Sequence, residues 1–251
     1  MKIKFLGTGT STGVPEIGCK CLVCTSSDKR DNRLRASVKI EVDDRNIFID
    51  CSPDFRLQTM ELAFEKIDGI LITHEHYDHT GGIDDLRPFS QFGPIDLYAE
   101  PRVESILRER LAYCFNAQYG GVPQIILNSI THLHPFLVKG IEIIPIRVMH
   151  NKLPILGYRI GNIAYLTDVK MLPQEEILKL SNLDVLILSA LRIEEHISHQ
   201  NLSQAIALAH QIHAKRTYFT HMSHHIGLHS IVEKTLPTTV HFAYDGLEIN
   251  I

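Results

Sequence analysis

Apolar side chains recur along this 251-residue chain in two rhythms, and each rhythm predicts a different kind of element. Short runs rich in isoleucine, valine and leucine predict strands, and the isoleucine-rich run over 67–73 is typical of a strand buried on both faces. A turn over 43–46 separates the second strand from the third. The expected strands cover 2–6, 37–42, 46–50, 67–73, 95–99, 141–148, 156–160, 163–167, 185–188, 216–220, 240–244 and 247–251.

Helical periodicity falls between some of these strands. Helices are predicted over 55–64, 102–111, 173–180, 202–212 and 228–236, and Asn201 is suited to cap the fourth of them. Strands with interspersed helices predict an α/β protein whose sheets are covered by helices. Because the sequence shows neither repeats nor linkers, we expect a single domain over residues 1–251.

Composition narrows the function classes. The chain is 44% hydrophobic and 22% charged, with a net charge of −4 and no run of basic residues. The absence of a basic stripe argues against binding of a long nucleic acid, because such binding needs basic side chains to neutralise the phosphates. It does not exclude small phosphorylated substrates. No apolar run approaches the ~20 residues of a membrane span, and the start does not resemble a secretory signal, so a cytoplasmic protein is expected.

The densest group of chemically active side chains directly follows the predicted strand over 67–73. His74, His76, Asp78 and His79 are four side chains of metal-ligating types within six positions, and Gly81 and Gly82 come shortly after them. Imidazoles and carboxylates together suit Zn, Mn or Fe, and two such groups suit a pair of ions. A solvated polar loop with incidental histidines is the alternative, and this density at a strand end disfavours it.

Three further candidates also follow predicted strands directly: His150, Asp168 and His221. In α/β proteins, ligands bind beyond the carboxyl ends of strands. One such histidine alone is more often structural, but three residues placed in this way together favour a ligand role.

These residues, taken in order, resemble the metallo-β-lactamase superfamily, with its HxHxDH motif, later His, later Asp and final His. The resemblance implies an αβ/βα four-layer sandwich and a binuclear hydrolase. It also implies that Asp50 orients a ligand. One ion would be held by His74, His76 and His150, and the other by Asp78, His79 and His221, with Asp168 bridging the two.

The N-terminal segment narrows the branch. The glycine-rich stretch 7–15, the pattern Cys19-x-Cys21-x-x-Cys24 and the stretch 82–89 resemble the phosphodiesterase branch, and in particular the phosphoribosyl cyclic phosphate phosphodiesterases of phosphonate breakdown. Three thiolates predict a structural zinc, for which His224 is the expected fourth ligand and His225 the rival. Three free thiols are the alternative. The glycine-rich stretch is equally consistent with a pocket edge or with a plain tight turn.

The function that follows is cleavage of a small phosphodiester, for which a cyclic ribose phosphate is one candidate, through attack of a hydroxide shared by two Zn or Mn ions. Asp78, Asp168 and His199 are predicted to carry catalysis. The resemblance gives His199 the role of donating a proton to the leaving oxygen, and a histidine that merely packs at the helix start is the alternative. Glu75 and Tyr77, between the ligands, do not discriminate substrates.

Several rival functions stay open at this point. Within enzymes they are a tRNA 3′-processing nuclease, which would be expected to carry a long RNA-binding insertion, and a lactone or thioester hydrolase. Outside hydrolysis they are a metal-binding scaffold and the oxygen chemistry of flavin-linked diiron relatives. A homodimer is the expected assembly, on the general frequency of dimers alone.

Overall fold

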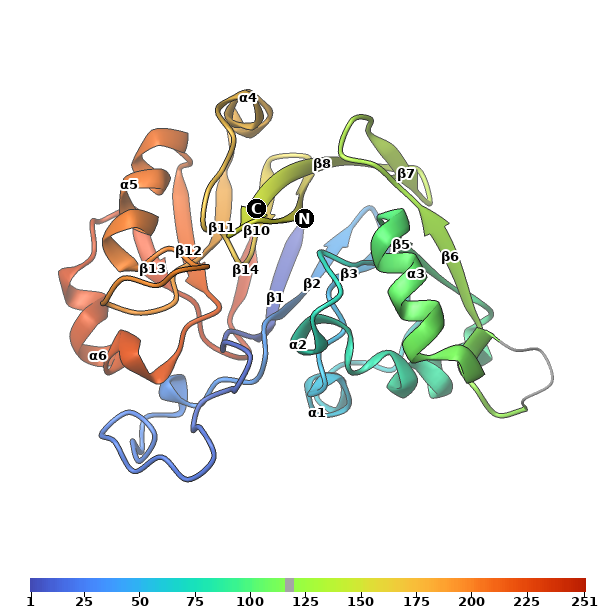
Figure 1. Ribbon diagram of the computed structural model, residues 1–251, viewed down its shortest axis with the longest axis horizontal. Coiled ribbons are helices and arrows are strands. Elements are labelled where there is room, and N and C mark those ends of the chain that lie inside the picture. Colours follow the sequence, from blue (N-terminus) through green and yellow to red (C-terminus); the bar gives the residue numbers. More distant parts are fainter. Residues whose placement is uncertain (116–119) are drawn as a thin grey trace.

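Two seven-stranded sheets form the centre of the computed structural model, which describes residues 1–115 and 120–251 (Figure 1). The first sheet has the order β14-β1-β2-β3-β4-β5-β6. Its strands are β1 (Lys2–Gly7), β2 (Ser37–Val42), β3 (Arg45–Ile49), β4 (Gly69–Leu71), β5 (Ile95–Ala99), β6 (Ile125–Ser129) and β14 (Glu248–Asn250).

The second sheet has the order β13-β12-β11-β10-β9-β8-β7. Its strands are β7 (Phe136–Val138), β8 (Ile141–His150), β9 (Leu153–Ile160), β10 (Ile163–Leu166), β11 (Val185–Ser189), β12 (Arg216–Thr220) and β13 (Val240–Phe242). Strands β10 to β13 are parallel, and β8 and β10 are both antiparallel to β9, so β8 runs in the direction of β10.

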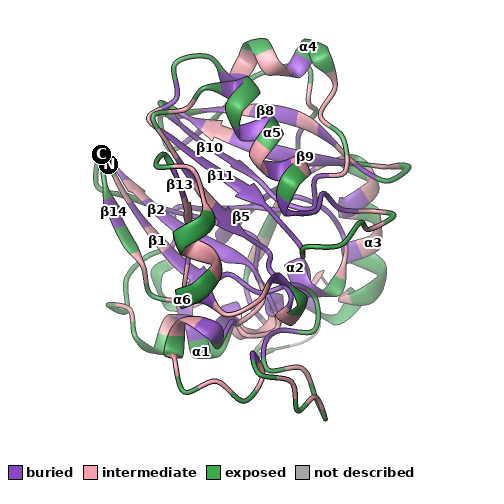
Figure 2. Cartoon of the chain, turned by 90° about the vertical axis from the view of Figure 1, so that its left-hand side faces the viewer, coloured by how far each residue is buried: buried purple, intermediate pink, exposed green. Residues whose placement is uncertain are grey.

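The helices lie on the outer faces of the two sheets. They are α1 (Phe55–Met60), α2 (Tyr77–Thr80), α3 (Pro101–Arg110), α4 (Gln174–Ile177), α5 (Leu202–Ile212) and α6 (His229–Val232). Short 3-10 segments cover Lys29–Asp31, Ile83–Phe92, Ala112–Phe115, Leu178–Leu180, His224–Ile226 and Glu233–Thr235. Figure 2 shows buried positions along the strands and exposed ones on the outward sides of the helices. The predicted αβ/βα four-layer sandwich is confirmed.

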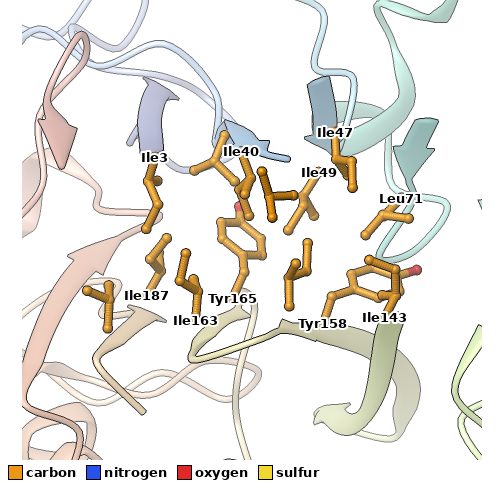
Figure 3. Packing of buried hydrophobic residues seen from close by; sticks show 14 of the residues in the cluster. Ile3, Ile40, Ile47, Ile49, Leu71, Ile143, Tyr158, Ile163, Tyr165 and Ile187 are labelled. Carbon is orange, nitrogen blue, oxygen red and sulfur yellow. The ribbon is translucent and has the colours of Figure 1, made fainter. Parts of the chain in front are cut away.

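One hydrophobic core lies between the sheets, and one lies under the helices of each sheet. In the central core, Ile40 and Ile49 of the first sheet face Tyr158, Ile163 and Ile187 of the second (Figure 3). Tyr158 keeps its hydroxyl in this core by donating to the Ile72 carbonyl at 2.6 Å. This packing fixes the position of one sheet against the other.

The predicted elements differ from the observed ones mainly at their ends. Helix 55–64 ends at Met60, and helices 173–180 and 228–236 each continue from a short α-helix into a 3-10 turn. The expected strand over 67–73 is regular only over Gly69–Leu71. Strands β6 and β7 were not predicted, because β6 and β7 lie at sheet edges and their mixed burial leaves a weak pattern. The 3-10 segment Ile83–Phe92 was also not predicted.

Helix α5 begins where the sequence places it. Asn201 accepts from the Gln204 backbone N–H at 3.0 Å, and the Gln204 side chain accepts from the Asn201 N–H at 3.2 Å, forming a capping box. Between β2 and β3, Asp43 and Asp44 both have positive φ and form the two-residue turn that a tight hairpin needs. No helix in the described ranges is both long and apolar enough to cross a membrane.

Candidate metal centre

Five candidate residues directly follow strands at one edge of the two sheets. Asp50 follows β3, His74 lies three residues after β4, His150 ends β8, Asp168 follows β10 by two residues, and His221 follows β12. Strands β3 and β4 are parallel to each other, as are β10 and β12 through β11, so within each sheet these carboxyl ends lie at a common edge. The fold therefore gathers side chains that are up to 171 positions apart in the chain, from Asp50 to His221.

Three of these residues have a left-handed backbone. The φ angles are 64° at Asp50, 52° at Asp168 and 56° at His221. A non-glycine residue in this conformation costs of order 1 kcal/mol or more and persists only where its surroundings enforce it. Here the conformation turns the chain sharply at the end of each strand and leaves the side chain at the sheet edge.

The HxHxDH segment forms a bend that ends in the short helix α2. His76 precedes the helix, and Asp78 and His79 lie in its first turn. The glycines that follow permit close backbone packing, because a Cβ at Gly82 would lie 2.0 Å from the Ser52 carbonyl oxygen. The predicted bend around a common point is present, although the helix itself was not predicted.

Asp50 fixes the orientation of His79. Its Oδ2 accepts from His79 Nδ1 at 2.6 Å, while its Oδ1 accepts from the Thr73 backbone N–H at 2.9 Å. All three residues are buried. With Nδ1 engaged, the free atom of the ring is Nε2, which is the arrangement of a metal-binding histidine held by a carboxylate. The structure thus places Asp50 where the sequence reading needs it.

The ligand atoms fall into three groups, within each of which all atoms lie within 4.8 Å of one another. The groups are His74 with His79 and Asp168, Asp78 with His79 and His221, and His150 with Asp168 and His199. Asp168 and His79 each belong to two groups, and of these two residues the carboxylate of Asp168, with its two oxygens, is the one suited to bridging. His76 stands slightly apart, with Nδ1 3.0 Å from His74 Nε2 and its ring 5.3 Å from that of His150.

The chemistry of these side chains fits divalent cations. Burial alone lowers the pKa of His79, but the carboxylates of Asp78, Asp50 and Asp168 outweigh it and raise that pKa well above the ordinary value. His79 Nε2 lies 3.2 Å from both Asp78 Oδ2 and Asp168 Oδ2, yet makes no aligned hydrogen bond within the described part of the chain. His221 Nε2 likewise makes no aligned hydrogen bond within the described part of the chain. Buried carboxylates facing imidazole nitrogens without partners match a site for positive charge.

His150 and His199 lie on the side of the candidate site that faces the second sheet. His150 Nδ1 donates to the Ser198 carbonyl at 2.9 Å, which leaves its Nε2 for the site. The His199 ring lies 4.5 Å from that of His150, and its Nδ1 is 3.7 Å from Asp168 Oδ1. Burial lowers the pKa of His199 to about 3, against the opposing effect of Asp168. His199 therefore lies against the candidate ligands His150 and Asp168.

A second cluster brings the N-terminal cysteines to the loop after β12. Cys19, Cys21, Cys24 and His224 place their ligand atoms within 4.8 Å of one another. His224 Nδ1 lies 3.2 Å from Cys21 Sγ and 3.5 Å from Cys19 Sγ. The Cys24 backbone N–H and the His224 ring lower the pKa of the Cys21 thiol to about 6, which favours a thiolate. This donor set fits a closed tetrahedral zinc site, and the structure brings His224 to it as predicted.

Cys21→Ser is expected to remove zinc from this cluster and to lower the Tm. An ion present at about 1,000 times its Kd contributes about 4 kcal/mol, which corresponds to roughly 10 °C for a chain of this size. Zinc content by elemental analysis and thermal unfolding measure the two effects. Cys114→Ser, away from the cluster, should keep the zinc count. An unchanged count in Cys21→Ser would contradict the assignment.

Three backbone N–H groups of the glycine-rich stretch are bonded to carbonyls of the protein itself. Gly9 N–H donates to the Leu34 carbonyl at 2.7 Å, Thr10 N–H to Met222 at 3.1 Å, and Gly13 N–H to Thr10 at 2.8 Å. Of the two readings left open by the sequence, the structure supports the turn. The bond from Thr10 N–H to the Met222 carbonyl connects the stretch to the residue after His221. The stretch therefore helps to hold the backbone at His221.

Sequence reasoning missed the residues that hold the His199 loop. Lys170 Nζ donates to the His196 carbonyl at 2.7 Å, and Ser198 orients His150 through its backbone oxygen. A backbone carbonyl leaves no signal in the side-chain sequence. The position of Lys170, two residues after the candidate ligand Asp168, was the one feature of the sequence that pointed to a role near the site.

Comparisons with known proteins agree with this geometry. The model of the family described as "Beta-lactamase superfamily domain" matches residues 45–222. The solved structure of a diphosphatase from the PhnP family is 39% identical, with a TM-score of 0.93 over 99% of this chain and 96% of that one. The zinc-bound PqqB of Methylobacterium extorquens shares the fold at 19% identity, with a TM-score of 0.82 over the full length of both chains.

An octanoyltransferase of Porphyromonas gingivalis is 45% identical over 99% of this chain but only 51% of its own length. The chain thus spans about half of that curated relative. The family model covers most of the chain and includes the candidate ligands from His74 to His221. The chain therefore belongs to the β-lactamase superfamily and has the metallo-β-lactamase fold.

Proposed function

We propose that this protein is a binuclear metal-dependent hydrolase that cleaves a small phosphodiester. The observation that carries the proposal is the convergence of buried imidazoles and carboxylates at one sheet edge, with Asp168 shared between two ligand groups. The similarity to a PhnP-family diphosphatase over nearly the whole of both chains supports phosphate chemistry.

The candidate residues would bind two metal ions and supply a proton. When bound, two divalent ions would stabilise negative charge on the phosphoryl oxygens and lower the pKa of water. His74, His76 and His150 would hold one ion, Asp78, His79 and His221 the other, and Asp168 both. His199 lies beside this group on the side of the second sheet. It would donate a proton to the leaving oxygen. An anionic diester next to the ring favours its protonated form.

Metal removal tests the proposal directly. Protein stripped with a chelator should not hydrolyse bis(p-nitrophenyl) phosphate, and added Mn or Zn should restore turnover. The reason is that the charge on the phosphoryl oxygens is not neutralised by the protein side chains alone. Release of p-nitrophenolate measures the rate, and five-membered cyclic ribose phosphates are the next substrates to compare. A protein that binds both ions and cleaves no phosphodiester would contradict the proposal.

An acyl-ester or thioester hydrolase is the second candidate. The observation in its favour is the 45% identity to one half of a protein named as an octanoyltransferase. A metal pair polarises a carbonyl as well as a phosphoryl group. Hydrolysis of an octanoyl thioester, assayed beside the phosphodiester with the same metal-loaded protein, separates the two candidates.

A further inference from the structure

Glu75 lies between two candidate ligands, His74 and His76, and its surroundings show that it is more than a spacer. It is only 8% exposed. Its carboxylate pairs with the guanidinium of Arg102 at the start of α3, and its backbone oxygen accepts from Arg110 Nη1 at 2.6 Å. One helix therefore holds both polar ends of Glu75.

Arg102 also reaches the second sheet. Its Nη2 donates to the Pro154 carbonyl at 2.9 Å. Pro154 lies in β9 opposite Met149 of β8, one position before His150, which itself pairs with Leu153. A single guanidinium thus connects the HxH segment of one sheet to the hairpin that carries His150 in the other.

Two neighbouring links between the sheets lie before His74 in the chain, and the ion pair of Arg147 in β8 with Glu100 joins the residue before α3 to the second sheet. Leu156 N–H donates to the Thr73 carbonyl at 3.0 Å, and Tyr158 donates to Ile72. These bonds fix the chain before His74, whereas the Arg102 bridge acts on the residue after it. His76 is half-buried, and its ring contacts are with His74 and His150. The bridge therefore joins the residue before His76 to the hairpin that carries His150.

We propose that Arg102 is a positioning residue that sets the distance between His76 and His150 by joining Glu75 to Pro154, and thereby sets the affinity for one of the two active-site ions. The planar fork of a guanidinium can donate to two oxygens on different segments at once, which a lysine ammonium does not reproduce. This inference rests on the metal site of the proposed function, but it concerns metal binding and not turnover.

Metal affinity is the test. In Arg102→Met, we expect the affinity for one active-site zinc to fall about 10- to 100-fold, the size of effect seen when the partners of metal ligands are removed. The second active-site ion should stay bound because Asp50, not Arg102, orients His79. The ion at the cysteines should also stay. Chelator competition measures each affinity, and the absorption spectrum of the cobalt-substituted protein reports the geometry of the weakened site.

Two further variants and one control sharpen the result. Arg102→Lys should recover little of the affinity, and Glu75→Gln, which keeps the shape of the side chain, should reproduce part of the loss. Arg108→Met is the control on the same helix, since Arg108 pairs only with Glu104 and Phe115 in the described structure. A variant counts as folded if it still binds zinc at the cysteine cluster and if the Tm of its metal-free form equals that of the metal-free wild type.

The outcomes separate this inference from the proposed function. Full affinity in both Arg102→Met and Glu75→Gln, or an equal loss in Arg108→Met, would overturn the role of Arg102. Wild-type protein that binds both ions but lacks phosphodiesterase activity would overturn the proposed function and leave the affinity comparison intact. Wild-type protein that binds zinc at the cysteines alone would overturn both.

Discussion

Asp168→Asn is expected to lower phosphodiesterase turnover by about a thousand-fold or more, because one carboxylate serves two ligand groups. Asparagine is the informative replacement. The backbone at this position is left-handed, with a φ of 52°, and asparagine tolerates that conformation better than alanine does. The change therefore removes the negative charge while adding little backbone strain. Steady-state hydrolysis of bis(p-nitrophenyl) phosphate by metal-loaded protein measures the loss.

Asp184→Asn is the matched control. Asp184 pairs with Lys215 at 2.6 Å, away from the metal centre, and this surface pair contributes little to stability. Its turnover should match the wild type within about two-fold, an effect below 0.5 kcal/mol. Metal content should fall in the Asp168 variant and stay constant in the control. Asp168→Asn that retains both ions and full activity would remove the bridging role.

His199→Ala should separate substrates by their leaving groups. We expect a loss of about 10²- to 10⁴-fold for a ribose cyclic phosphate, whose departing alkoxide needs a proton. The loss should be much smaller for bis(p-nitrophenyl) phosphate, because p-nitrophenolate departs without one. The measurement is kcat for both substrates with the same enzyme preparation.

His196→Ala controls for general disturbance of this loop. The His196 ring lies 5.1 Å from that of His199 but is less buried, and it accepts locally from the Ser198 N–H at 3.3 Å. Its loss should affect both substrates equally and only slightly. A leaving-group dependence that appears in His196→Ala instead would transfer the proton-donor role to that residue. Equal losses for both substrates in His199→Ala would indicate that His199 only shapes the pocket.

The candidate ligands were visible in the sequence because metal chemistry restricts residue types severely. It is rare by chance to find four metal-ligating residues within six positions together with a His or Asp after later strands. This pattern marks a candidate site without any tertiary information. The same holds for three cysteines within six positions. Strong local signals also placed α5, since Asn201 and the apolar face of 202–212 act within one segment.

Weak or shared signals explain what was missed. The edge strands β6 and β7 bury few side chains, so their sequences carry little periodicity. The glycine-rich stretch was open to two readings because its backbone N–H groups could face a ligand or other carbonyls. Only the packed structure shows that Leu34 and Met222 accept them.

By itself, the sequence determined the residue types of the candidate metal centre and the strands that precede them, because both follow from local chemistry and periodicity. Only the tertiary structure decided that His224 rather than His225 joins the cysteines, that Asp50 holds His79, and that Arg102 joins the two sheets through Glu75 and Pro154. These contacts connect residues far apart in the chain. Their geometry depends on how the two sheets pack, which no single segment encodes.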